Sequence, residues 1–123
     1  MSRTSRVTLG LGAVALLVAV GALRAQDVAV ANPDTIKVTL DNARVRVMEA
    51  TLKPGVKEQM HSHPASVIYV IAGGKVRSHS RNGVISEATY TAGETIYREP
   101  LTHWAENIGT TTIRLVVTEL KDR

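Results

Sequence analysis

The chain has 123 residues, enough for one domain, and it contains no cysteine, which excludes disulfides and thiolate metal sites. The formal net charge is +4, but Arg3, Arg6 and Arg24 precede the first acidic residue, and removing them from the 15 basic residues leaves 12 against 11 acidic ones. Because this remainder is balanced and only four residues are Trp or Tyr, nucleic acid is not an expected partner.

Residues 1–25 have the order of a secretory signal peptide. Two arginines among the first six residues are followed by an uncharged apolar run, residues 7–23, and then by small residues. We predict cleavage after Ala25, with a second small-residue site ending at Ala31, and export to the periplasm or the exterior. The alternative is that residues 7–23 remain as a membrane anchor, the only membrane contact expected.

Residues 35–121 are predicted to form one all-β domain after a linker over residues 26–34. No later stretch shows a sustained helical repeat; short apolar and β-branched segments alternate with turn signals, the clearest being Asn82-Gly83. Strands are expected at residues 36–40, 44–52, 60–63, 67–71, 75–80, 84–90, 95–98, 103–107 and 111–120. This spacing predicts an antiparallel sandwich or barrel.

Two histidines one residue apart, His61 and His63, stand in one of these strands. Residues i and i+2 of a strand point to the same face and lie about 6.6 Å apart, so their imidazoles can converge on one metal ion. The same pair also occurs on exposed strand faces without any function. Its surroundings must therefore decide between the two interpretations.

Those surroundings resemble the two motifs of the cupin superfamily. The residues that match the first motif are Gly55, His61, His63 and Gly74, and those that match the second, more loosely, are Gly93, Pro100, His103 and Asn107. The resemblance covers roughly residues 35–120. It implies a small single-domain cupin with the antiparallel jelly-roll β-barrel that is also called RmlC-like.

The resemblance further implies that His61, His63 and His103 bind one divalent transition metal ion. Cupins usually supply a glutamate where this chain has Val67, and residues 59–86 contain no acid, so three neutral ligands are expected. The expected metal is Fe, Zn, Ni, Cu or Mn, and the ligand type alone does not determine which. Because some cupin dioxygenases have three histidines, a dioxygenase-type oxidoreductase acting on a small molecule is the first functional hypothesis.

Two other functions stay open: a module that binds a small molecule or a metal without turnover, and a metal-free isomerase in which a histidine acts as base. Trp104 is expected to point away from the three histidines, and His79 to lie outside the site. A homodimer that pairs through residues 36–52 is also expected, as in other single-domain cupins.

Four further residues are candidates for the pocket or its surroundings. Gln59 shares strand parity with the histidines and is either a weak fourth ligand, a donor behind the ligands or a surface residue. Tyr69 and Tyr97 lie on strands that line the barrel in cupins, where either would wall a pocket. Arg98 stands near the expected barrel mouth, where it either pairs with an anionic ligand or is an ordinary surface arginine.

Overall fold

The computed structural model describes residues 26–122, so the predicted signal segment lies outside the described residues. The elements are α2 (Val28–Ala31), β1 (Ile36–Asp41), β2 (Val45–Leu52), β3 (His61–His63), β4 (Ser66–Ala72), β5 (Gly74–Ser80), β6 (Ile85–Tyr90), β7 (Thr95–Arg98), β8 (Leu101–Asn107) and β9 (Ile113–Leu120). Every predicted strand is present, with its ends shifted by no more than two residues. Within residues 26–122, no helix is long and apolar enough to span a membrane.

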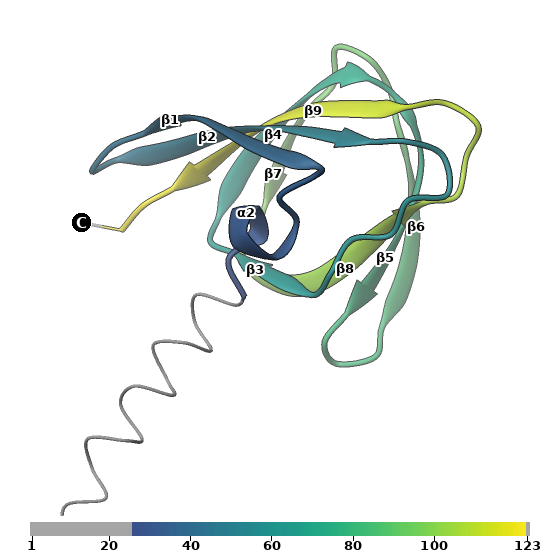
Figure 1. Cartoon of the computed structure of the whole chain (residues 1–123), viewed down its shortest axis with the longest axis horizontal. Helices are drawn as coiled ribbons and strands as arrows, with labels where there is room; N and C mark the ends of the chain where they lie inside the picture. The colour runs from purple at the N-terminus through teal and green to yellow at the C-terminus, as the bar shows by residue number, and fades with distance from the viewer. Residues whose placement is uncertain (1–25, 123) are drawn as a thin grey trace, which may run out of the picture.

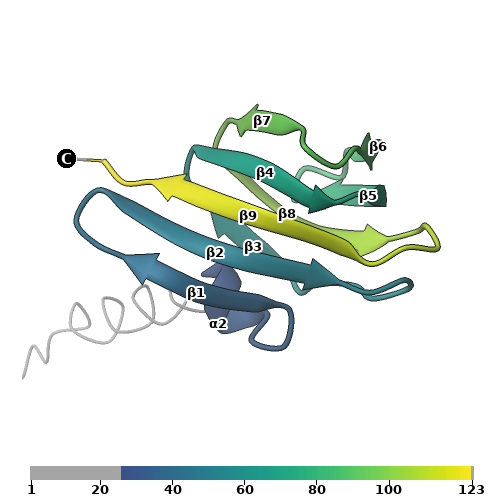
Figure 2. The same ribbon diagram turned by 90° about the horizontal axis from the view of Figure 1, so that it is seen from above.

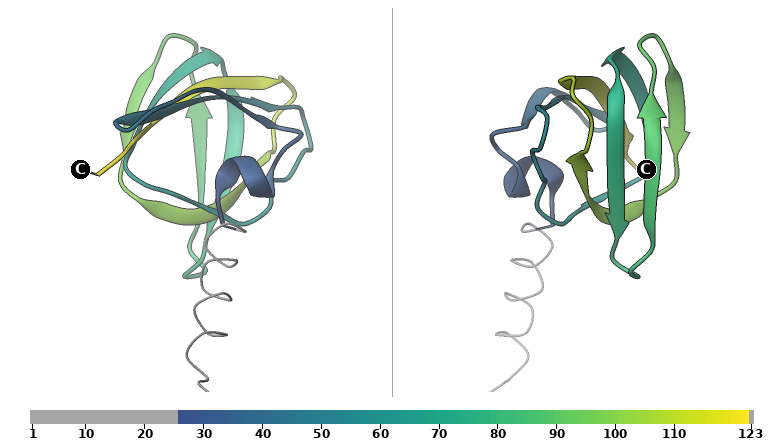
Figure 3. Two further views of the ribbon diagram at one scale, coloured as in Figure 1. Left: turned by 60° about the vertical axis from the view of Figure 1, so that its left-hand side comes forward. Right: turned by 90° about the vertical axis from the view of Figure 1, so that its right-hand side faces the viewer.

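The strands form two antiparallel sheets that face each other (Figures 1 and 2). The five-stranded sheet has the order β1-β2-β9-β4-β7, and the four-stranded sheet has the order β3-β8-β5-β6. The chain crosses from one sheet to the other several times, so strands distant in sequence become neighbours. Figure 3 shows the two sheets curving around a common interior. The predicted all-β antiparallel architecture is confirmed.

The Asn82-Gly83 turn joins β5 and β6, as its sequence predicts. Gly83 has φ of +87°, a conformation that costs little without a side chain. The backbone N–H of Val84 donates to the Asn82 side-chain oxygen at 3.1 Å, and the N–H of Gly83 donates to the carbonyl of Ser80 at 2.9 Å. These contacts close the hairpin and set the pairing of the two strands.

Inward-facing residues of both sheets form an aliphatic core. One cluster contains Leu52, Val70, Val76, Tyr90, Ala105 and Ile113, and the other contains Val28, Ile36, Met48, Ile68 and Val117. Because the chain has no phenylalanine, Met48 and Tyr90 are the bulkiest members. This core occupies most of the interior and leaves one end of the barrel for polar side chains.

Residues 26–34, predicted to be a linker, instead fold onto the domain. The carboxylate of Asp27 caps α2 by accepting from the backbone N–H groups of Ala29 and Val30, at 3.0 and 3.3 Å. Val28 is 1% exposed and Asn32 is 6% exposed. A helix of one turn has no apolar repeat to recognise, and for that reason the sequence pattern did not reveal this segment.

Candidate metal centre

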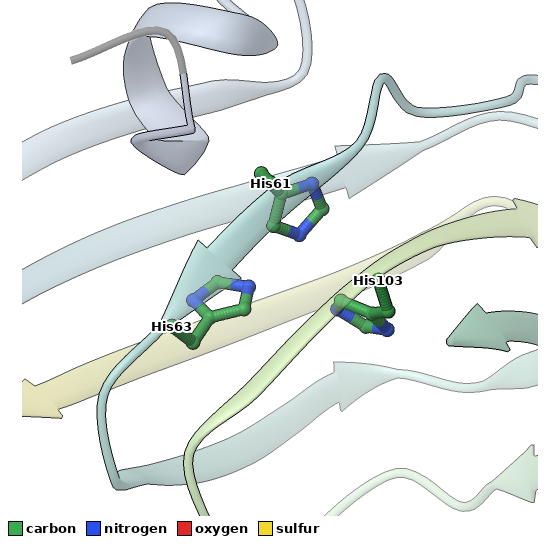
Figure 4. A group of neighbouring side chains, drawn as sticks. All are labelled: His61, His63 and His103. Atoms are coloured by element: carbon green, nitrogen blue, oxygen red, sulfur yellow. The ribbon is translucent and has the colours of Figure 1, made fainter. Parts of the chain in front are cut away.

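The three predicted ligands meet at one end of the barrel. Alternation along β3 places the His61 and His63 side chains on the inner face, and the pairing of β3 with β8 sets His103 directly opposite His61. The ring centroid of His61 lies 4.7 Å from that of His63 and 4.8 Å from that of His103. Figure 4 shows the three rings gathered around one point.

The nitrogen positions nearly match the needs of a metal ion. One ring nitrogen from each histidine lies within 4.8 Å of the other two. An ion that binds each nitrogen at 2.0–2.1 Å requires them to lie within about 4.2 Å of one another. Ring rotations that move each nitrogen by about half an ångström would close this difference.

Each of the three rings has a protein group facing its Nδ1 atom. Nδ1 of His61 lies 2.7 Å from the carbonyl oxygen of Gln59, and Nδ1 of His103 lies 2.7 Å from the hydroxyl of Ser78. Nδ1 of His63 faces a carboxylate oxygen of Glu119 at 3.6 Å. When Nδ1 carries the proton toward such a group, Nε2 holds the lone pair that a metal ion requires.

Burial keeps two of the rings in their neutral form. It lowers the pKa of His61 to about 4 and the pKa of His103 to about 3, and at His103 the neighbouring imidazoles and Arg98 add to the effect. Both rings are therefore unprotonated at neutral pH. Neutral imidazole is the form that binds a metal.

Sequence reasoning missed the carboxylate of Glu119, which lies behind His63. Burial alone would raise the pKa of Glu119, but contacts with His63 and Arg46 outweigh it and lower the pKa. One oxygen of Glu119 accepts from Nε and Nη2 of Arg46 at 2.9 and 2.6 Å. The other oxygen and Nδ1 of His63 are, within residues 26–122, buried without a hydrogen-bond partner.

The three expected ligands are neutral, but the fold places an acid behind one of them. Glu119 is distant from His63 in sequence and arrives through the pairing of β9 with β4. Position 67, where cupins usually have a glutamate, does not face the histidines in this structure. Ser66 and Ile68 are the buried inward residues of β4, so Val67 points to the outer face, away from the histidines.

Tyr69 and Tyr97, predicted to wall the pocket, are 48% and 58% exposed and lie on the outer face of the five-stranded sheet. The side chain of Gln59 is also exposed, and this residue contacts His61 through its backbone carbonyl instead. Trp104 points outward as predicted, where its ring stacks on His79 with centroids 3.7 Å apart. His79 is accordingly outside the histidine cluster.

A cavity of about 70 Å³ is lined by two of the three histidines, His63 and His103. Its polar lining includes Glu58, His63, Ser66, Ser78, Arg98 and His103. A second, wider cavity of about 300 Å³ shares Ser78, Tyr90 and Arg98 with the first. Arg98 thus lines both cavities, and Glu58, which lines the first, was not among the expected site residues.

The carboxyl group of Glu58 is ordinarily ionised at neutral pH, but burial raises its pKa to about 7. Its backbone N–H donates to the carbonyl of Ala105 at 2.8 Å, which holds it beside β8. The side chain of the preceding residue, Lys57, lies 3.8 Å from Glu106 on the outer face, consistent with Glu58 facing inward. Glu58 stands in the spacer between Gly55 and His61, where the motif specifies no residue type and the segment forms no regular strand.

Comparison with known proteins finds no matching family model and no matching curated protein. Solved structures do match. A cupin domain from Bordetella pertussis has a TM-score of 0.65 and 27% identity, over 71% of this chain and 92% of that one. An uncharacterised protein with a double-stranded β-helix domain from Klebsiella pneumoniae has a TM-score of 0.56 and 24% identity, over 71% and 76% of the two chains. An RmlC-like cupin from Methanocaldococcus jannaschii has a TM-score of 0.58 and 14% identity, over 70% and 78%.

Proposed function

The chain has the fold of a small cupin, and from that premise we propose that it binds one divalent transition metal ion through His61, His63 and His103. The observation that carries the proposal is the arrangement of the three Nδ1 atoms, each facing a protein group that can hold its proton. Histidines that ligate a metal almost always use their second nitrogen in this way. The donor set therefore fits a borderline transition metal.

The buried atoms that lack partners support the same proposal. Nδ1 of His63 and Oε2 of Glu119 face each other at 3.6 Å, longer than a hydrogen bond. If the His63 ring rotates to bind a metal ion, the distance between its Nδ1 atom and Oε2 of Glu119 changes as well, so the present 3.6 Å need not be the distance in the metal-bound protein. Glu119 is held by Arg46 and stays ionised, so it supplies negative charge near a cation without ligating it.

The finer proposal is an oxidoreductase of the dioxygenase type acting on a small molecule. When bound, the metal supplies a Lewis-acid or dioxygen-binding centre. The residues of the chain would hold the ligands in place, present Arg98 and Glu58 to the cavity beside them, and keep bulk water away with the aliphatic core.

A second candidate function is a binding module without turnover, which the cavity lined by His63 and His103 supports equally well. The metal-free isomerase has less support. With pKa values of about 4 and 3, His61 and His103 are weak bases at neutral pH. Oxygen consumption with a panel of small substrates separates the enzyme from the binding module, because only the enzyme consumes oxygen.

Metal content by elemental mass spectrometry tests the proposal. The protein is purified without a histidine tag beside the double variant His61→Ala/His63→Ala, and His79→Gln serves as control because His79 lies outside the cluster. We expect about one metal ion per chain, lost in the double variant and kept in the control. No bound metal after incubation with Fe(II), Mn(II), Zn(II), Ni(II) or Cu(II) would contradict the proposal.

Two proposals about the chain as a whole remain. Export is supported by the order of charged, apolar and small residues in the first 25 positions. A homodimer through residues 36–52 is supported by the exposure of Val38 and Leu40, at 41% and 48%. Light scattering of the purified protein checks the second, and a monomer mass would contradict it.

A further inference from the structure

A row of polar side chains crosses the inner face of the five-stranded sheet at the level of the histidines. Strand register places Arg46 opposite Glu119, Glu119 opposite Ser66, and Ser66 opposite Arg98. The next inward row consists of Met48, Val117, Ile68 and Ile96, which are all apolar. The polar row therefore forms the wall that faces the histidines, with one arginine toward each end.

The two arginines differ in their partners. Arg46 forms ion pairs at 2.6 Å with both Glu119 and Asp27. Arg98 forms no ion pair with any residue from 26 to 122; one of its nitrogens, Nη2, donates to the hydroxyl of Tyr90 at 2.7 Å. A guanidinium has five N–H donors, and a partly buried charge is costly without a counter-charge.

Arg98 lines both cavities, so its remaining donors have space in front of them. The inner cavity of about 70 Å³ provides about five to seven water-sized positions. A ligand of four to six non-hydrogen atoms has about this size. The wider outer cavity, which shares Arg98 and Tyr90 with the inner one, offers a route of entry.

We propose that Arg98 binds the carboxylate of a small monocarboxylic acid in the cavity beside the three histidines. Two parallel N–H···O bonds from the guanidinium fork match a carboxylate in geometry and charge. This inference deepens the proposed function and rests on it, because it places the acid next to the proposed metal.

Glu58 selects for a single carboxylate. It lies between β2 and β3, where its N–H bonds to Ala105 of the opposite sheet, and it lines the same cavity, close enough for Arg98 to influence its ionisation. Beyond Arg98, a second carboxylate of the ligand would meet this acidic group instead of a second cation. A hydroxyl or carbonyl oxygen can instead share a hydrogen bond with the Glu58 carboxyl group.

The test is a titration followed by ¹H–¹⁵N nuclear magnetic resonance, with metal-free and Zn(II)-loaded protein. The probes are acetate, glycolate and pyruvate, each beside its neutral primary amide of nearly the same shape. We expect saturable binding of at least one acid, with a shift of the Arg98 Nε–Hε resonance, and at least about tenfold weaker binding of the matching amide.

Arg98→Gln is expected to weaken acid binding by about tenfold or more without changing metal content. Arg77→Gln is the matched control, because Arg77 lies on the outer face and pairs with Glu87. Arg98→Lys keeps the charge but loses the planar fork, and is expected to bind with intermediate affinity. The spectra also show whether each variant is folded.

Equal affinity for an acid and its amide, unchanged affinity in folded Arg98→Gln, or no saturable binding of any acid would overturn the inference. The two proposals can fail separately. Acid binding to a protein that takes up no metal supports the Arg98 subsite and contradicts the metal site. Metal uptake without acid binding supports the metal site and contradicts the Arg98 subsite.

Discussion

At the scale of single residues, Glu119 has the most specific role. Its carboxylate faces Nδ1 of His63 while Arg46 holds its other oxygen. An ionised carboxylate behind an imidazole fixes the tautomer of the ring and raises its basicity toward a metal. Position 67, in contrast, points outward and has no means of acting on the histidines.

Glu119→Gln should therefore weaken metal binding by about 10- to 100-fold, because the amide keeps the shape but loses the charge. Competition with a chelator of known affinity measures the change. Glu106→Gln, which alters a carboxylate of the outer face, should bind metal as the unmodified protein does. Equal metal affinity in both variants would show that Glu119 does not act on His63.

Glu58 predicts a dependence of stability on pH. Its pKa is raised from 4.5 to about 7, so the folded state holds its proton where the unfolded state has released it. The free energy of unfolding should fall as pH rises from about 4.5 to about 7. Glu58→Gln should not show this loss. Between pH 4 and pH 8, the stability of the variant relative to that of the unmodified protein should therefore rise by about 1–3 kcal/mol.

Urea unfolding of both metal-free proteins at the two pH values measures this difference. The lowered pKa values of His61 and His103 act in the opposite sense, since their stabilising effect is lost as pH falls below 6.5. Because both histidines are present in both proteins, their effect largely cancels in the comparison. A stability difference that is the same at both pH values would contradict the assignment.

At the scale of elements, the segment from Gln26 to Asn32 closes the histidine end of the barrel. The N–H of Ser62, between the two histidines of β3, donates to the carbonyl of Gln26 at 2.6 Å. The side chain of Asn32 holds Gln59, whose carbonyl faces His61: its Oδ1 accepts from the N–H of Gln59 at 2.7 Å and its Nδ2 donates to the carbonyl of Gln59 at 3.3 Å. This short segment therefore supports the ligands as well as the core.

A chain that begins at Pro33 should be less stable than one that begins at Gln26 by about 2–4 kcal/mol. It loses the buried side chain of Val28 and the ion pair between Asp27 and Arg46. Urea unfolding of the two proteins measures the difference. Equal stability would mean that the segment contributes nothing to the fold.

The same packing bears on the predicted processing of the chain. Cleavage after Ala31 would remove Asp27 and Val28, which the domain uses, whereas cleavage after Ala25 would keep both. We therefore expect the cleavage that we propose to leave a chain that begins at Gln26. The intact mass of the protein recovered from the periplasm or medium checks this, and a start at Asn32 would contradict it.

At the scale of the whole molecule, the metal should stabilise the fold. Its three proposed ligands come from β3 and β8, so an ion joins strands that are far apart in sequence. A ligand that binds the folded state alone, at 100 times its dissociation constant, adds about 2.7 kcal/mol. For a domain of this size that corresponds to a rise in melting temperature of about 10 °C.

Thermal unfolding with and without added metal measures this rise, and a chelator should reverse it. The rise should be absent in His61→Ala/His63→Ala and present in His79→Gln, whose altered residue stacks on Trp104 on the outer face. An equal rise in the double variant would mean that the metal binds elsewhere.

Local patterns in the sequence determined the strands, the Asn82-Gly83 hairpin and the shared face of His61 and His63. These features depend on neighbours a few residues away, through side-chain alternation and turn geometry. The likeness to the cupin motifs added His103. Apart from α2, the secondary structure therefore followed from the order of residues alone.

Only the tertiary structure decided what surrounds those histidines. Glu119 reaches His63 through the pairing of β9 with β4, and Arg98 reaches the cavity because β7 pairs with β4 in one particular register. A shift of that register by one residue would reverse which side chains face inward, and strand parity alone left Tyr97 and Arg98 equally eligible for the pocket. No short segment determines which strands pair over a long distance in sequence. The residues that face the ligands from the opposite sheet could therefore be identified only from the tertiary structure.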